Sequence, residues 1–209
     1  MKVGDIKIEA LRLMFAELDP LVSASNLTSY ENSDTIGEYL AGMTGSINRA
    51  LADIESRRIL PERSVCLADI TSVQGRHGKR YDLSAPAINF YDVSRIILES
   101  DEGYDGCAPY RMEGKKLVLL FPHDSADVTL LYYPKIPPIA TYDNNKELEL
   151  PNEIAGVIPY FIKGELYRLD EIGDAAEAMS WYEQRIAALS PNSTDIQTHV
   201  VPTYSQVTL

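Results

Sequence analysis

Residues 147–189 read ELELPNEIAGVIPYFIKGELYRLDEIGDAAEAMSWYEQRIAAL, and their spacing predicts two helices joined by a tight turn. The apolar residues of the first helix form one broad face: Ile154, Val157, Ile158, Phe161, Ile162 and Leu169. Pro159 lacks a backbone donor, so we expect a kink or a late start of the helix there. The apolar residues of the second helix also share one face: Ala175, Met179, Tyr182, Ile186 and Leu189.

Residues 170–174 are expected to form the turn between these helices. Gly173 is predicted to adopt a left-handed conformation at the end of the first helix. Asp174 is predicted to cap the second helix, with Glu177 three residues on in the capping-box position. Such a hairpin exposes apolar faces that further helices must cover.

Two more amphipathic helices are predicted near the start of the chain. The first spans residues 6–18 and ends at Asp19-Pro20, with these apolar residues on one stripe: Ile8, Leu11, Phe15 and Leu18. The second is capped by Asp34 and has this apolar face: Ile36, Leu40, Met43, Ile47, Ala50 and Ile54. Gly42 and Gly45 lie on it, and close packing against another helix is one reason for small residues there.

From residue 64 to 136 the pattern changes to short β-branched and aromatic runs separated by Gly, Pro, Asp and Ser, which indicates antiparallel strands. RMEGKKLVLLF (111–121) predicts a hairpin turning at Glu113-Gly114, and PKIPPIATYDNN (134–145) predicts a stiff connector. The predicted fold class is α+β. Helices from residues 1–62 and 141–190 form a small bundle, residues 63–140 an inserted antiparallel β module, and residues 191–209 an extended C-terminal arm.

Composition is that of an ordinary globular protein, with 45% hydrophobic and 24% charged residues in 209. No run approaches the roughly 18 apolar residues that span a bilayer. Asp5 and Glu9 argue against a signal peptide, so we expect a soluble protein made in a cytoplasm. Free thiols at Cys66 and Cys107 are then favoured over a disulfide, which stays open.

The net charge is −12, and residues 141–209 alone hold four Lys and Arg against eleven Asp and Glu, a net of −7. A strongly acidic chain repels nucleic acid. The acidic surface is therefore either a solubilising surface or one along which DNA passes without sticking.

No residue pattern predicts a catalytic, cofactor-binding or metal site. The histidines, His77, His123 and His199, have no second ligand at metal-binding spacing, and His123, Asp124 and Ser125 are adjacent in a loop rather than converging. The one basic cluster is QGRHGKRY (74–81). It is either an exposed hairpin tip or a loop that contacts an acidic partner or a DNA backbone through Arg76, Lys79 and Arg80.

Seven aromatic residues gather in the second half of the chain: Tyr132, Tyr133, Tyr160, Phe161, Tyr167, Trp181 and Tyr182. We assign them to the core or to an interface rather than to cofactor stacking.

The order of these parts resembles a known family. An IGEYLAGMTGSINRALADI helix (36–54) precedes a β module that contains YDLSAPAINFYDVSRIIL (81–98) and GKKLVLLFPHDSADVTLLYYPKIPPI (114–139), and the hairpin closes it. Over residues 5–190 this is similar to the head-to-tail adaptor proteins of tailed bacteriophages, also called connector, head-completion or tubular tail proteins. The most specific part runs from YYPKIPP through an acidic linker to LPNEI and the helical hairpin.

The resemblance implies a structural virion protein without enzymatic activity or cofactor. Copies would form a homo-oligomeric ring, typically twelvefold, at the neck of the virion after synthesis in the host cytoplasm. The ring would contact the portal protein and a downstream tail, stopper or nozzle protein, and DNA would pass through its channel without specific binding, with no membrane involved. The arm would bind the portal or a neighbouring subunit through its β-prone residues: Val200, Val201, Tyr204 and Val207.

Two alternatives stay open. The first is a non-enzymatic β-rich ligand- or peptide-binding module, which predicts a concave, aromatic-lined pocket in the β region. The second is an enzyme using His77 or His123, which requires a converging carboxylate that the sequence does not reveal.

Overall fold

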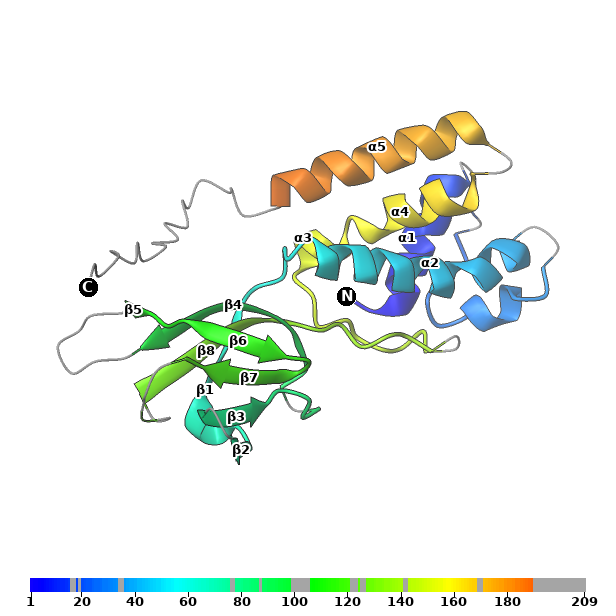
Figure 1. Ribbon diagram of the computed structural model, residues 1–209. Coiled ribbons are helices and arrows are strands. Elements are labelled where there is room, and N and C mark those ends of the chain that lie inside the picture. Colours follow the sequence, from blue (N-terminus) through cyan, green and yellow to red (C-terminus); the bar gives the residue numbers. More distant parts are fainter. Residues whose placement is uncertain are drawn as a thin grey trace, which may run out of the picture.

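The computed structural model describes residues 1–15, 18, 20–33, 36–75, 78–86, 88–98, 106–120, 124, 127–140, 143–168 and 171–189. Figure 1 shows helices gathered on one side of the molecule and strands on the other. The protein therefore has the predicted α+β fold, with a helical part and an antiparallel β part. The predicted arm, residues 191–209, lies outside the described residues.

The helical part contains α1 (Val3–Met14), α2 (Ile36–Ser56), α3 (Asn152–Ala155), α4 (Ile158–Leu166) and α5 (Ile172–Leu189), with a 3-10 turn, η1 (Leu27–Tyr30). The helix α4 lies at the centre and packs against α1, α2 and α5. One hydrophobic cluster joins residues from both ends of the chain. Its fully buried aliphatic members include Ile6, Leu11, Met43, Ile47, Ile54, Ile158, Ile162 and Ile186. The two ends of the sequence thus build one core, because neither helical pair can bury its apolar face alone.

The first helix starts and ends earlier than the predicted range of residues 6–18. It runs over Val3–Met14, and the chain leaves the helix at Phe15 in an extended conformation. That exit lets the Phe15 ring meet the edge of Tyr39, with ring centroids 5.4 Å apart. Phe15 and Leu18 still pack against the cluster, so the tertiary contact, rather than Asp19-Pro20, ends the helix.

The second helix, α2, buries the predicted apolar face at Leu40, Met43, Ile47, Ala50 and Ile54. Asp34, the predicted cap, lies outside the described residues. The Ser33 hydroxyl accepts a hydrogen bond of 3.3 Å from the Ile36 N–H. The residue just before the predicted cap thus satisfies one backbone donor at the start of α2.

Of the two glycines predicted to allow close packing, one does so. A Cβ on Gly42 would lie 2.7 Å from Leu166 Cδ2, so α2 and α4 approach closely there. The prediction of close packing is wrong for Gly45, because a Cβ there would meet only the Arg49 guanidinium at 3.5 Å, which is an ordinary contact. Gly37 is the tighter position, because a Cβ would lie 2.4 Å from the Glu31 carbonyl oxygen.

Alanine at these two glycines should have opposite effects on stability. Gly45→Ala should raise the free energy of unfolding by about 0.5–1 kcal/mol through helix propensity alone. Gly37→Ala should lower it by about 1–3 kcal/mol, because a backbone oxygen has to move. Urea unfolding of both variants, followed by far-UV circular dichroism, measures the difference. Equal shifts would contradict the close approach at Gly37.

The predicted hairpin of residues 147–189 forms, but Gly173 and Asp174 do not have the predicted roles at its turn. Its first helix is divided into α3 and α4, with Pro159 in the first turn of α4, so the late start predicted from Pro159 is confirmed. Gly173 is not left-handed, since α5 begins at Ile172 and includes it. Asp174 therefore lies in the first turn of α5 instead of capping it, and its carboxylate lies 3.1 Å from Lys163 Nζ on α4. Leu169 and Asp170 are outside the described residues.

The β part consists of two antiparallel four-stranded sheets. The first sheet has the order β1-β8-β4-β5, with β1 (Arg63–Cys66), β8 (Val128–Pro134), β4 (Phe90–Leu98) and β5 (Gly106–Cys107). The second has the order β2-β3-β7-β6, with β2 (Ser72–Gly75), β3 (Gly78–Asp82), β7 (Lys116–Leu119) and β6 (Tyr110–Glu113). A short 3-10 turn, η2 (Leu67–Asp69), follows β1. The sheets share their own hydrophobic cluster, separate from that of the helices, which includes Leu67, Tyr81, Ile96, Leu117 and Leu130.

The predicted hairpin of residues 111–121 turns one residue later than expected. Glu113 pairs with Lys116, so the two turn residues are Gly114 and Lys115. Gly114 has a φ of 64°, a value that glycine tolerates and that type II′ hairpin turns require at this first position. The glycine, not the Glu-Gly pair, therefore sets the turn.

The connector after β8 is held along the helical part by hydrogen bonds. The Asn48 side chain of α2 accepts from the Ile139 N–H (2.8 Å) and donates to the Ile139 carbonyl (3.0 Å). Farther on, the Lys146 and Asn144 carbonyls accept the first N–H groups of α1, from Val3 (3.0 Å) and Gly4 (2.8 Å). The connector thus caps the first helix and fixes the β part to the helices.

Candidate functional site

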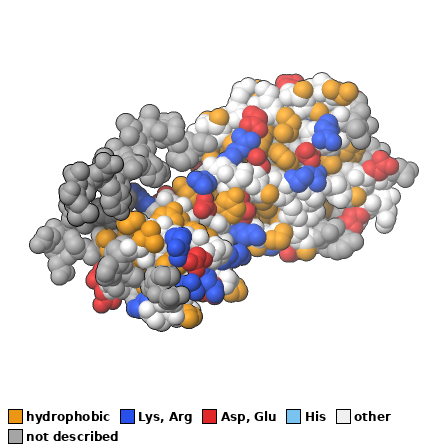
Figure 2. Space-filling model, in the orientation of Figure 1, with side chains coloured by type: hydrophobic (Ala, Val, Ile, Leu, Met, Phe, Trp, Pro, Cys, Tyr) orange, Lys and Arg blue, Asp and Glu red, His pale blue; other side chains and the backbone are white. Residues whose placement is uncertain are grey.

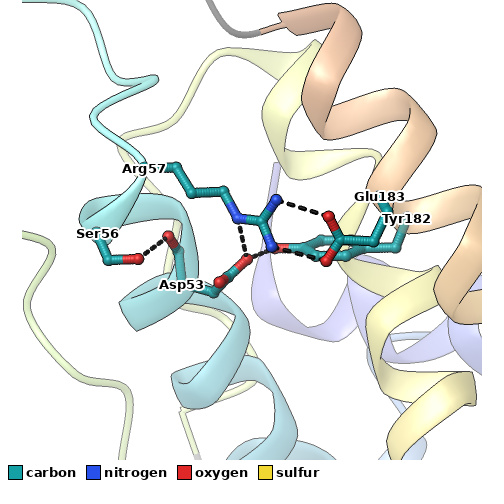
Figure 3. Close-up of polar contacts among 5 residues, drawn as sticks. All are labelled: Asp53, Ser56, Arg57, Tyr182 and Glu183. Carbon is teal, nitrogen blue, oxygen red and sulfur yellow. Dashed lines mark hydrogen bonds and ion pairs between the residues drawn. The ribbon is translucent and has the colours of Figure 1, made fainter.

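A cluster of polar side chains joins the end of α2 to α5. Figure 3 shows the Arg57 guanidinium facing the Glu183 carboxylate, with two hydrogen bonds of 2.7 Å. Arg57 Nε lies 2.8 Å from Asp53 Oδ2, and the same oxygen accepts a 2.7 Å hydrogen bond from the Tyr182 hydroxyl. We call Asp53, Arg57, Tyr182 and Glu183 the clasp.

The electrostatics of the clasp follow from its geometry. The bidentate hydrogen bonds with Glu183 raise the pKa of Arg57, and the same bonds lower the pKa of Glu183. Burial raises the pKa of Tyr182, and its hydrogen bond to Asp53 raises it further. Because its polar groups bind one another, the clasp holds α2 and α5 together.

Stability at alkaline pH should depend on the Tyr182 hydroxyl. The folded state keeps this proton above the pKa of an unfolded tyrosine, near 10, so the contribution is complete below about pH 10 and is lost as the pH rises further. Tyr182→Phe should cost about 1 kcal/mol at about pH 9, and this gap should nearly close at about pH 11. Urea unfolding at both pH values measures it, and a constant gap would contradict the raised pKa.

The basic cluster of the sequence lies on the β2–β3 hairpin. Gly75 pairs with Gly78, and Lys79 and Arg80 lie on β3. Arg76 is outside the described residues. The structure brings Arg80 together with a residue that the sequence analysis did not select, Arg111 on β6, because both pair with Val118 on the strand between them.

Arg80 and Arg111 share one carboxylate on the outer side of the second sheet. Arg80 Nε lies 3.0 Å from Glu113 Oε2, and Arg111 Nη2 lies 2.5 Å from Glu113 Oε1. Val73, paired with Arg80 on the neighbouring edge strand, is 63% exposed. We call Val73, Arg80, Arg111, Glu113 and Val118 the arginine face. Figure 2 shows Lys and Arg side chains with acidic ones among them over β6 and β7.

A second exposed surface runs along α5. Asp174, Glu177 and Trp181 recur at helical spacing of three and four residues and are all exposed, Trp181 at 47%. Arg185 lies over the Trp181 ring, 6.0 Å from its centroid. We call Asp174, Glu177 and Trp181 the tryptophan stripe. The helical spacing of these three residues is visible in the sequence, but only the packing of α5 on α4 shows that this side of α5 is exposed.

A groove of about 560 Å³ lies at the junction of the two parts. Its walls come from the end of the α2–β1 link, the start of the connector and residues 146–152, and none of its lining residues is aromatic. The junction is tied by an Arg58–Asp92 ion pair and by the Asn89 side chain, which donates to the Lys135 carbonyl at 2.7 Å.

The other predicted site residues lie outside the described part of the chain. These are the arm residues Val200, Val201, Tyr204 and Val207 and the three histidines. Cys66 forms no disulfide within the described part of the chain, and the side chain of Cys107 is not described. Within the described ranges, no three His, Cys, Asp or Glu side chains lie close enough together to hold a metal ion. None of the described helices has the length and apolar character needed to cross a membrane.

No protein-family model matches the chain, and no curated protein is significantly similar to it.

Proposed function

We propose that the protein is a head-to-tail adaptor of a tailed bacteriophage. In this role it is a structural subunit without enzymatic activity, and copies form a ring beneath the portal that lengthens the DNA channel and receives the next tail component. The proposal applies to this chain the family that its sequence resembles.

The observation that carries the proposal is the way the two parts are connected. The core of the helical part is built from residues before 61 and after 138, and the β module is inserted between them with a hydrophobic cluster of its own. This is the arrangement that the resemblance implies, a small bundle closed by a C-terminal hairpin around an inserted β module. This arrangement supports the proposal because the shared core depends on packing between distant segments, whereas the resemblance rests on the order of segments along the sequence.

Charge supports the same proposal. The chain carries a net charge of −12, and such a surface repels the DNA backbone rather than binding it. A channel through which DNA must leave quickly benefits from walls that do not retain it. The clasp uses its polar groups to hold α2 and α5 together.

The groove at the junction favours a second candidate, a non-enzymatic ligand- or peptide-binding module. Its volume suits a small ligand or a few residues of a peptide. A binding module of this kind predicts an aromatic-lined pocket in the β region. The groove differs from that pocket, since its described lining has no aromatic side chain and lies beside the β region rather than within it.

Electron microscopy of the protein mixed with the portal ring encoded in the same genome tests the proposal. We expect added density as a ring on one end of the portal. Bare portals beside unbound copies, over a range of salt and protein concentrations, would overturn the adaptor function. A truncated chain ending at Leu189 then tests the arm, which is expected to be needed for tight attachment.

A further inference from the structure

The arginine face carries an excess of positive charge on an acidic protein. Two guanidiniums share the single carboxylate of Glu113, and the Arg80 and Arg111 side chains are 40% and 50% exposed. A carboxylate neutralises one arginine, so the second charge is not balanced within the cluster. A surface of this kind attracts carboxylates of a partner.

The arginine face is also rigid and partly apolar. Alternation along β7 turns Val118 away from Leu117 and Leu119, which lie in the core cluster, yet Val118 is only 2% exposed. Its paired neighbours on both sides are Arg80 and Arg111, so we infer that their aliphatic stems cover it. With the exposed Val73 beside Arg80, the face presents guanidinium planes and aliphatic surface held in place by the sheet.

The tryptophan stripe has the complementary chemistry. Asp174 and Glu177 supply carboxylates. The chain's own Arg185 lies over the Trp181 ring, 6.0 Å from its centroid, and the remaining exposed part of this half-exposed ring is an aromatic surface of the kind on which guanidinium groups stack. Tryptophan and arginine are the residues most often found at the centre of protein interfaces. The Lys163 ammonium lies 3.1 Å from the Asp174 carboxylate, whereas no Lys or Arg of the described residues forms an ion pair with Glu177 on the same stripe.

The two surfaces lie in different parts of the molecule. In Figure 1, α5 runs along the top of the helical part, whereas β7 lies in the middle of the β part with β3 below it. A copy therefore cannot place its own stripe on its own arginine face. A contact between two different surfaces of identical chains is heterologous, and repeated heterologous contacts close into a ring when the rotation between copies allows it.

We propose that the tryptophan stripe of one copy docks on the arginine face of the next, with Trp181 packed on Arg80, Arg111 and Val73 and with Asp174 and Glu177 paired to the guanidiniums. This identifies the subunit contact of the proposed ring and rests on that proposed function. The occupant is a second copy rather than DNA, because the chain supplies matching carboxylates and its overall charge opposes nucleic acid.

Charge reversal of each surface gives a stringent test. One variant combines Arg80→Glu with Arg111→Glu, and the other combines Asp174→Arg with Glu177→Arg. Each variant alone then has two surfaces of like charge and should associate at least tenfold more weakly than the unmodified protein. Mixed in equal amounts, the two variants have complementary surfaces at every contact and should assemble again, in alternation. Restored assembly also proves that both variants fold.

Trp181 provides the direct readout, since it is the single tryptophan of the chain. Its emission should shift to the blue when copies associate, and light scattering measures the size of the assembly, with and without the portal ring. The matched control exchanges an exposed ion pair of α1, Glu9→Arg with Arg12→Glu, and should assemble like the unmodified protein. Val73→Glu is a milder variant for the case in which the double arginine variant does not fold.

The outcomes separate this contact from the adaptor function. Rings that form equally well with both reversed variants would overturn the contact and leave the adaptor function standing. No association of the unmodified protein, either alone or on the portal, would overturn both. Binding of duplex DNA that is lost with the arginine variant, without association of copies, would overturn the contact in favour of nucleic acid.

Discussion

Replacing Tyr182 with alanine should lower the free energy of unfolding by about 3–5 kcal/mol, as large-to-small changes at buried aromatic residues do. Tyr182 is fully buried on α5, and its ring meets the edge of Phe161 on α4, with centroids 5.0 Å apart. Its hydroxyl donates to Asp53 on α2, and the Arg57 guanidinium lies over the ring, 5.9 Å from its centroid. One side chain thus connects the consecutive helices α4 and α5 to α2, which is distant in sequence.

Two neighbouring variants make this prediction specific. Tyr182→Phe keeps the ring and should cost only about 1 kcal/mol, which is the net value of one hydrogen bond. Trp181→Ala, at the preceding residue but on the exposed side of α5, should change the free energy of unfolding by about 0.5 kcal/mol or less. Urea unfolding of the three variants measures these differences. A loss at Trp181 as large as that at Tyr182 would contradict the orientation of α5.

The second large effect is expected at Leu130, where alanine should cost about 2–5 kcal/mol. Leu130 lies on β8, an interior strand of the first sheet, and pairs with Val65 on one side and Ile96 on the other. It is fully buried in the cluster between the two sheets. Its removal leaves a cavity that two hydrogen-bonded neighbouring strands cannot collapse to fill.

The loss of stability caused by Leu130→Ala should be confined to the β part, because that part has a hydrophobic cluster of its own. Hydrogen exchange of Leu130→Ala should quicken at amides of β4 and β8 while amides of α2 and α4 keep their protection. Ile47→Ala, in the core of the helical part, is the matched control and should give the reverse pattern. Equal loss of protection in both parts with either variant would mean that the two clusters unfold together.

The helices of the fold could be predicted because the apolar residues that one side of a helix buries recur along the sequence with the helical period. The α2 residues Met43, Ile47, Ala50 and Ile54 recur every three to four positions, and the structure buries all of them in the helical core. Helix ends were predicted less well. Asp174 has the residue type and spacing of a cap, but α5 extends back to Ile172 and Asp174 pairs with Lys163 of α4.

The candidate surfaces were predicted only in part. Lys79 and Arg80 stand out as a basic cluster in the sequence, but Arg111 is 31 residues beyond Arg80 and joins it only through the pairing of β6 and β3 with β7. The clasp was not predicted at all, because Arg57 and Glu183 lie 126 residues apart. The spacing of Asp174, Glu177 and Trp181 was available, but spacing cannot identify which side of a helix remains uncovered.

The order of helices and strands, the α+β class and the acidic character of the protein can all be predicted from the amino-acid sequence. These properties depend on neighbouring residues or on sums over the chain, and a periodic pattern or a charge count expresses them directly. Three further features emerge from tertiary packing: segments before residue 61 and after residue 138 share one core, Arg80 and Arg111 converge on Glu113, and Trp181 remains exposed. Each of these depends on which distant segments pack together, and that choice is made by the burial of the whole chain rather than by any local pattern.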